Sequence, residues 1–154
     1  DMNTIKVIYT DRDGIVPRLI RLFTWSEWSH VAIVDGDTVI EAVMGKGVIE
    51  TPLAELQAES SLWKLEEYPC LDADAIIAAA RSQVGKPYDK TAIIGMLFNR
   101  DWQEDDSWFC SELVAYSFLQ GGRKLFRRDT LNRITPEHLW MLEPTSDLDL
   151  DKHL

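Results

Sequence analysis

The pattern of apolar and polar positions in the first half of the chain predicts short strands. Loose alternation over residues 5–9 is typical of a strand with one buried face. Two β-rich runs, 31–34 and 38–43, flank the dipeptide Asp35-Gly36, which predicts a tight β-hairpin. Four further elements are expected from the same kind of pattern: an amphipathic helix over 15–24, a strand over 47–51, a short helix over 52–57 and a strand over 62–68.

Helical patterns dominate the second half. Residues 72–84 are rich in Ala and Ile, begin with acidic side chains and are followed by glycine, as expected of a helix. Residues 109–120 are predicted to form another, and Thr135 followed by Pro136 predicts the start of a last short one. We also expect a helix over 91–98 and an acidic polar loop over 99–107. Because strands lead and helices follow, the fold class is α+β with a mainly antiparallel sheet packed against helices.

Composition indicates one globular domain. The chain has 154 residues, 45% of them apolar, and we expect a single domain over 1–144 and a loose acidic tail over 145–154. A net charge of −10 disfavours nucleic acid as a partner. No apolar run is long enough for a transmembrane segment and no signal peptide is visible, so we expect a cytoplasmic or particle-associated protein. The oligomeric state stays open.

Cysteine and histidine are few. Two cysteines, Cys70 and Cys110, do not make a disulfide framework, although a single bridge is compatible with the sequence. The three histidines form no close ligand pair with either cysteine. We therefore expect no metal and no cofactor.

Two polar residues, His30 and Glu41, lie on the predicted hairpin. If Asp35-Gly36 are the central turn residues, His30 faces Glu41 across the two strands, with Cβ atoms ~5 Å apart. A carboxylate beside one ring nitrogen fixes the tautomer and leaves the other nitrogen free as a base. The alternative is a solvated cross-strand pair with a structural role alone.

Cys110 falls at or near the start of a predicted helix. Exposed backbone N–H groups and the helix dipole at such a position favour a thiolate, and the same N–H groups can bind an oxyanion. The carboxylates of Asp105 and Asp106 act against the thiolate. A buried core thiol is the alternative interpretation. No base or helix start lies beside Cys70, for which we expect a structural role.

Several motifs together resemble a known family. The segments 82–89, with its Gly-Lys-Pro-Tyr run, and 108–116, with Phe-Cys-Ser-Glu-Leu-Val, look like the cysteine half of NlpC-type papain-like cell-wall peptidases. The segments 29–34 and 39–41 look like the histidine half. Here the histidine half comes first, which resembles the circularly permuted, YiiX-like branch, and the Thr-Pro-Glu-His-Leu segment 135–139 suits that branch.

The resemblance, which covers roughly residues 5–140, implies a permuted papain-like fold and assigns roles to individual residues. Cys110 matches the nucleophile, His30 the base and Glu41 the orienting third residue, while Tyr88 matches a tyrosine near the nucleophile. Two departures bear on the substrate site. Ala32 stands where glycine is common, and a Gly-Gly pair usual after the tyrosine motif is absent.

The tryptophans and the resemblance together give a functional hypothesis. Trp25 and Trp28 precede His30, and Trp102 and Trp108 precede Cys110, so we expect Trp28, Trp108 and Tyr88 to contact substrate; ordinary packing is the alternative. We predict a cysteine hydrolase that cleaves an amide in a cell-wall-type peptide, with a murein fragment as first substrate and a lipid acyl group second. The alternatives are an acyltransferase or acyl hydrolase, and a catalytically silent structural or binding module of the same fold, such as a phage-particle component.

Overall fold

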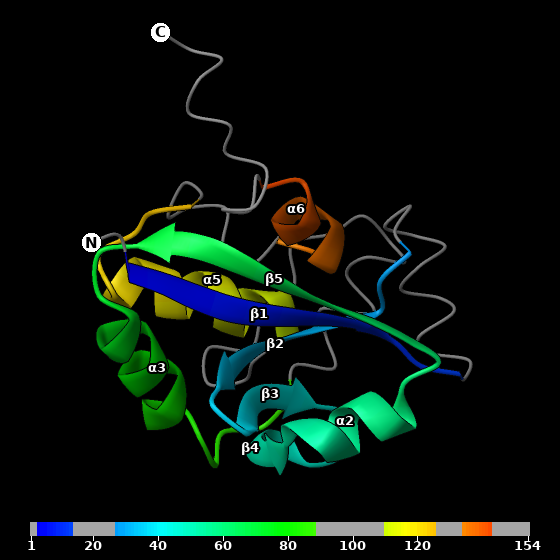
Figure 1. Cartoon of the computed structure of the whole chain (residues 1–154). Coiled ribbons are helices and arrows are strands. Elements are labelled where there is room, and N and C mark those ends of the chain that lie inside the picture. Colours follow the sequence, from blue (N-terminus) through cyan, green and yellow to red (C-terminus); the bar gives the residue numbers. More distant parts are fainter. Residues whose placement is uncertain (1–2, 14–26, 89–109, 126–133, 143–154) are drawn as a thin grey trace, which may run out of the picture.

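A five-stranded antiparallel sheet forms the centre of the protein (Figure 1). The computed structural model describes residues 3–13, 27–88, 110–125 and 134–142. Within these ranges the strands run in the order β4-β3-β2-β1-β5, and each neighbouring pair is antiparallel. The strands are β1 (Asn3–Asp11), β2 (His30–Asp35), β3 (Thr38–Val43), β4 (Gly47–Pro52) and β5 (Leu62–Cys70).

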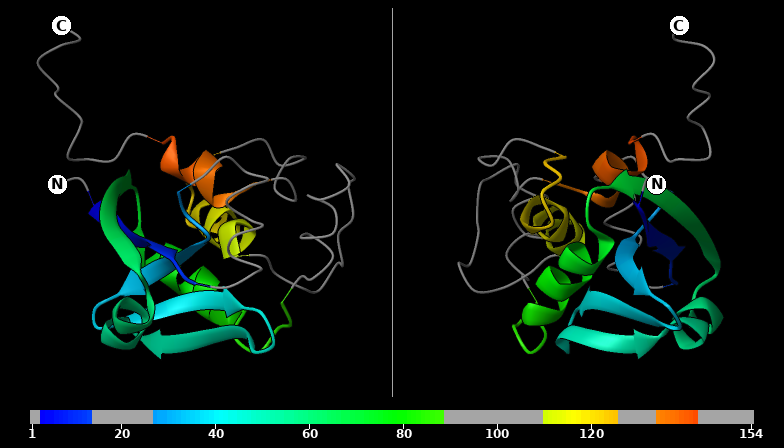
Figure 2. Two further views of the ribbon diagram at one scale, coloured as in Figure 1. Left: turned by 90° about the vertical axis from the view of Figure 1, so that its right-hand side faces the viewer. Right: turned by 60° about the vertical axis from the view of Figure 1, so that its left-hand side comes forward.

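The described helices cover both faces of this sheet. They are α2 (Leu53–Glu59), α3 (Ala73–Ser82), α5 (Cys110–Gln120) and α6 (Pro136–Trp140). The side chain of Asp72 caps α3 by accepting a hydrogen bond from the backbone N–H of Ala75, and Thr135 caps α6 in the same way. Figure 2 shows α3 and α5 on one side of the sheet and α2 on the other.

Alternate residues of β1, β2 and β3 point into two separate cores. On β2, Val31 and Ile33 belong to the larger core, which also contains Cys110 and other α5 residues. Ala32 and Val34 belong to the smaller core, which contains Leu56 of α2. This period of two is the one expected for a strand covered on both faces, and it holds α5 against the strand that begins with His30.

The turn of the β2–β3 hairpin lies one residue later than predicted. Asp35 pairs with Thr38, so the central turn residues are Gly36 and Asp37 rather than Asp35 and Gly36. Gly36 has a φ of 58°, the left-handed conformation that a tight hairpin turn needs at its first central position. The side chain of Thr38 closes the turn by donating a hydrogen bond to the carbonyl of Asp35 at 2.9 Å.

Side-chain pairing explains the difference in register. The observed register pairs Val34 with Val39, whereas the predicted one would set Val34 against Asp37. Cross-strand pairing of two buried β-branched residues is the more stable arrangement. The predicted direct opposition of His30 and Glu41 is therefore wrong. However, every partner shifts by two positions, so both residues still lie on the same face of the hairpin.

The predicted fold class and the predicted elements within the described ranges are confirmed. All five strands are present, and helices are found at 53–59, 73–82, 110–120 and 136–140. The predicted helices over 15–24 and 91–98, the polar loop over 99–107 and the tail over 145–154 lie outside the described residues, and the domain boundary at 144 stays a prediction. In the part of the chain that the structure describes, no helix is long and apolar enough to span a membrane.

Candidate active site

His30 and Glu41 form a close, largely buried pair. His30 is the first residue of β2 and pairs with Thr10 of β1. Its Nε2 atom lies 2.7 Å from Oε2 of Glu41 on β3, and only 2% of the Glu41 side chain is exposed. Because Oε2 of the Glu41 carboxylate can only accept a hydrogen bond, the Nε2 atom carries the hydrogen and Nδ1 is left for another partner.

Two further side chains hold the Glu41 carboxylate. Thr51 of β4 donates a hydrogen bond from its hydroxyl to Oε1 at 2.8 Å. The guanidinium of Arg12, just after β1, lies 3.9 Å from Oε2. Burial by itself would raise the pKa of Glu41, but the contacts with His30, Thr51 and Arg12 outweigh it and lower that pKa. Glu41 is therefore an ionised carboxylate at neutral pH.

Cys110 is the first residue of α5 and lies against the His30 ring. Its thiol forms a side-chain hydrogen bond with His30, while only 1% of the residue is exposed. With Nε2 occupied by Glu41, Nδ1 is the ring nitrogen left for the sulfur. The hydroxyl of the next residue, Ser111, donates to the carbonyl of Ile134 and fixes the start of α5 to the segment before α6.

These contacts raise the pKa of His30. Burial alone would lower it, but hydrogen bonds with Cys110 and Glu41 raise it from 6.5 to about 9. The ring is consequently protonated at neutral pH, between a sulfur and an ionised carboxylate. A sulfur, an imidazole and a carboxylate in one chain of hydrogen bonds can pass a proton and generate a nucleophile.

This raised pKa predicts a pH-dependent stability. Because the folded protein binds the His30 proton more tightly than the unfolded chain, the resulting stabilisation is complete below pH ~6.5 and is lost as the pH rises through about 9. This shift in the pKa of His30 corresponds to a contribution on the order of 3 kcal/mol to the free energy of unfolding. We expect the difference in unfolding free energy between the wild type and His30→Gln to shrink between about pH 6 and about pH 10. Urea unfolding at several pH values measures it, and a constant difference would contradict the assignment.

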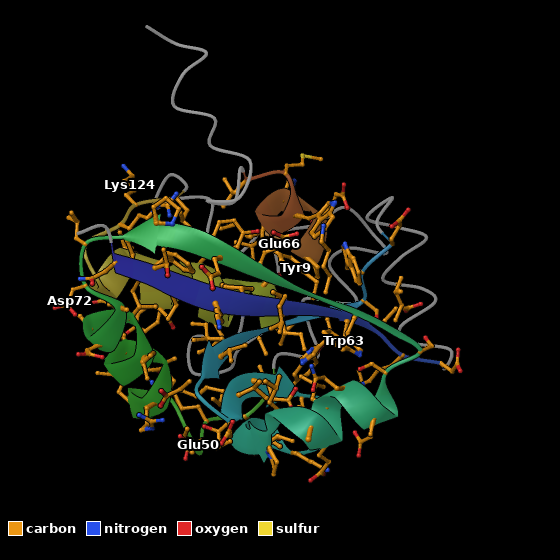
Figure 3. The ribbon with its side chains drawn as sticks, viewed as in Figure 1. Tyr9, Glu50, Trp63, Glu66, Asp72 and Lys124 are labelled. Atoms are coloured by element: carbon orange, nitrogen blue, oxygen red, sulfur yellow. The ribbon has the colours of Figure 1, made fainter. Side chains whose placement is uncertain are left out.

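The three residues predicted to contact substrate differ from one another in where they lie. Trp28 is a core residue, 3% exposed, whose ring packs against Tyr9 and Trp140 at centroid distances of 5.9 and 5.1 Å. Tyr9 lies beside α6 (Figure 3). Tyr88 is partly buried against the same core as Cys110. Trp108 lies outside the described residues, as do Trp25 and Trp102. A substrate contact by Tyr88, Trp28 or Trp108 stays a prediction.

Thr51 and Arg12 were not predicted from the sequence. Thr51 lies on a strand that was predicted, and its alternation with Ile49, the partner of Glu41, puts it diagonally across from the carboxylate. Register analysis of that second hairpin could therefore have found it. Arg12 gives no such signal, because it follows the end of β1 and reaches Glu41 only through the packing of β1 on β2.

No metal-binding cluster is present among the described residues. They contain no group of three or more His, Cys, Asp or Glu side chains arranged to hold a metal ion. The site has one histidine, one thiol and one carboxylate, and the carboxylate oxygens are already bound by His30, Thr51 and Arg12. These donors do not fit a metal centre, so no step is assigned to one.

The order of the elements defines the class of protein. A strand beginning with histidine precedes the helix that begins with cysteine, and both pack in one α+β fold, which is the arrangement of a permuted papain-like protein. The family profile for permuted papain-like amidase enzymes of the YaeF/YiiX type, the C92 family, matches residues 6–145. The chain belongs to this family.

A solved structure shows the same fold. The chain is similar to the crystal structure of the metalloprotein YiiX from Escherichia coli O157:H7, with a TM-score of 0.64 and 22% sequence identity. The similarity covers 82% of this chain and 70% of that one. A comparison with curated proteins gives no match.

Proposed function

We propose that the protein is a thiol-dependent amidase in which Cys110 is the nucleophile, His30 the general base and acid, and Glu41 the orienting group. The observation that carries the proposal is the position of His30, which is hydrogen-bonded to Cys110 on one side and to Glu41 at 2.7 Å on the other. A base between a nucleophile and an orienting carboxylate is the arrangement that nucleophilic catalysis requires. Membership of an amidase family supports an amide as the bond that is cleaved.

The first half of the reaction forms an acyl-enzyme. The His30 imidazolium holds at Nδ1 the proton that Cys110 has given up, and the Cys110 thiolate attacks the amide carbonyl carbon. Backbone N–H groups at the start of α5 stabilise the negative oxygen of the tetrahedral intermediate. The C–N bond then breaks as the His30 imidazolium gives its proton to the leaving amine, and a thioester remains on the sulfur.

The second half restores the enzyme. His30 removes a proton from water, the resulting hydroxide attacks the thioester carbonyl, and the C–S bond breaks. The carboxylic acid leaves and the proton returns to the sulfur. Through both halves Glu41 keeps Nδ1 directed at the sulfur by holding Nε2, and its negative charge stabilises each imidazolium.

We further propose a short peptide of cell-wall type as the substrate. Support comes from the segments 82–89 and 108–116, which resemble the cysteine half of cell-wall peptidases. An acyl ester of a lipid would follow the same thioester route, so it is the second substrate to assay. A catalytically silent structural module of this fold would cleave neither.

Differential thiol labelling tests the proposal. Exposure alone would make Cys70 the faster thiol, since Cys110 is 1% exposed and Cys70 is only partly buried. If His30 activates Cys110, iodoacetamide should instead label Cys110 faster at neutral pH, and His30→Ala should remove that advantage. Peptide mass spectrometry after timed labelling gives both rates. Slow labelling of Cys110 in both proteins would favour the silent module.

A muropeptide digest analysed by mass spectrometry, beside a lipid acyl-ester assay, then identifies the bond that is cleaved. New free carboxyl and amino ends in the peptides would support the cell-wall substrate. Ester hydrolysis with a trapped thioester on Cys110, in the absence of peptide cleavage, would reject it in favour of the lipid.

A further inference from the structure

Arg12 connects both parts of the His30–Glu41 pair. Its backbone N–H donates to the hydroxyl of Ser29, the residue directly before His30, at 3.2 Å. Its guanidinium Nη2 lies 3.9 Å from Oε2 of Glu41, the same oxygen that contacts His30. The side chain is 25% exposed, so solvent screens this charge less than it would screen a surface pair.

Among the groups described around Glu41, Arg12 is the one that is positively charged at every stage of the proposed reaction. His30 faces the carboxylate from β2 and carries a charge only when protonated, and Thr51 faces it from β4 as a neutral donor. From α2, Glu59 also contacts Arg12, with its Oε2 atom 3.5 Å from the same Nη2 atom. Among the contacts described for Glu41, the positive charge of Arg12 alone does not depend on the proton that the site transfers.

We propose that Arg12 is a positioning residue that keeps the Glu41 carboxylate ionised and aligned on His30. The inference rests on the proposed function, in which Glu41 orients the base. A buried carboxylate whose only cationic partner loses its proton during turnover would tend to take up a proton itself. Arg12 prevents this because its guanidinium stays charged throughout. Glu59 contacts the same guanidinium, but its side chain is 52% exposed and solvent therefore screens its charge.

A titration of His30 in protein with ¹⁵N-labelled histidine tests the inference without using a substrate. The His30 ring nitrogens report the protonation of Glu41 as a low-pH inflection, because Nε2 bonds directly to the carboxylate. In Arg12→Gln this inflection should move to higher pH by about one unit, the effect of removing an opposite charge at this distance. Arg12→Lys, which keeps the cation, should leave it near the wild-type position.

Matched controls separate this effect from general damage. Arg81→Gln removes an arginine of α3 whose ion pairs are with Asp35 and Glu50, and it should leave the inflection unmoved. His138, in its own capping hydrogen bonds with Thr135, serves as an internal reference. If Arg12→Gln does not fold, Arg12→Met removes the charge while keeping an apolar stem, and the same shift is expected.

An unmoved inflection in the neutral Arg12 variants, or an equal shift in Arg81→Gln, would overturn the inference. The result of the titration does not depend on whether the protein cleaves an amide. A protein that cleaves no amide would still show the shift if Arg12 keeps Glu41 ionised. An active enzyme whose inflection stays at the same pH in Arg12→Gln would refute the role of Arg12 and leave the proposed function standing. In an active enzyme, the acidic limb of the kcat/KM profile should move to higher pH together with the inflection in Arg12→Gln. It should keep its position in Arg12→Lys.

Discussion

Cys110→Ala should abolish amide hydrolysis, with kcat/KM falling by about 10³-fold or more relative to the wild type. Neither His30 nor Glu41 can take the place of the Cys110 sulfur in the attack on the carbonyl. The buried thiol packs in the larger core against α5 neighbours, and alanine leaves only a small cavity there. The rate should therefore be lost in a protein whose unfolding transition stays cooperative.

The matched control is Cys70→Ala. Cys70 ends β5 and packs at the edge of the same core, and burial raises the pKa of its thiol. No hydrogen bond between Cys70 and His30 is found among the described residues. The rate of Cys70→Ala should therefore stay close to that of the wild type. Steady-state kinetics on the cleaved substrate measure both variants. Equal loss in the two would refute the role of Cys110, as would retained activity in Cys110→Ala.

The His30–Glu41 contact could be predicted although the hairpin register was not. The segment Asp-Gly-Asp offers two adjacent turn positions, and only the packing of Val34 on Val39 selects the second. Either choice keeps His30 and Glu41 on the same face, because moving the turn by one residue moves each partner by two. The observed contact is diagonal rather than direct, and the long glutamate side chain spans the difference.

The approach of Cys110 to His30 could not be predicted from local patterns. Sequence showed a thiol at a helix start and a histidine at a strand start, but 80 residues separate them along the chain. Their meeting depends on the packing of α5 over β2, which follows from the shared core of Val31, Ile33 and α5. The resemblance to a permuted family supplied that convergence, whereas Arg12 was missed because neither periodicity nor a motif marks it.

His30→Ala and Glu41→Gln should reduce the rate to different extents. Loss of the base should lower kcat/KM by about 10³-fold, since the thiol then has no proton acceptor beside it. Glutamine can still accept the Nε2 hydrogen through its carbonyl oxygen, so Glu41→Gln should cost less, about 10²-fold. Steady-state kinetics across pH measure both, and equal losses would argue against an orienting role for Glu41.

The pH profile of Glu41→Gln distinguishes orientation from charge. In the wild type, the hydrogen bonds with Cys110 and Glu41 hold the pKa of His30 at about 9, so activity that needs the protonated ring declines only above that pH. Without the carboxylate charge the imidazolium is less stable, and the alkaline limb of kcat/KM should move to lower pH. A neutral amide that merely misaligned the ring would lower the rate at every pH and leave the limb in place. A lower rate with an unmoved limb would therefore show that the negative charge of Glu41 does not stabilise His30 during the reaction.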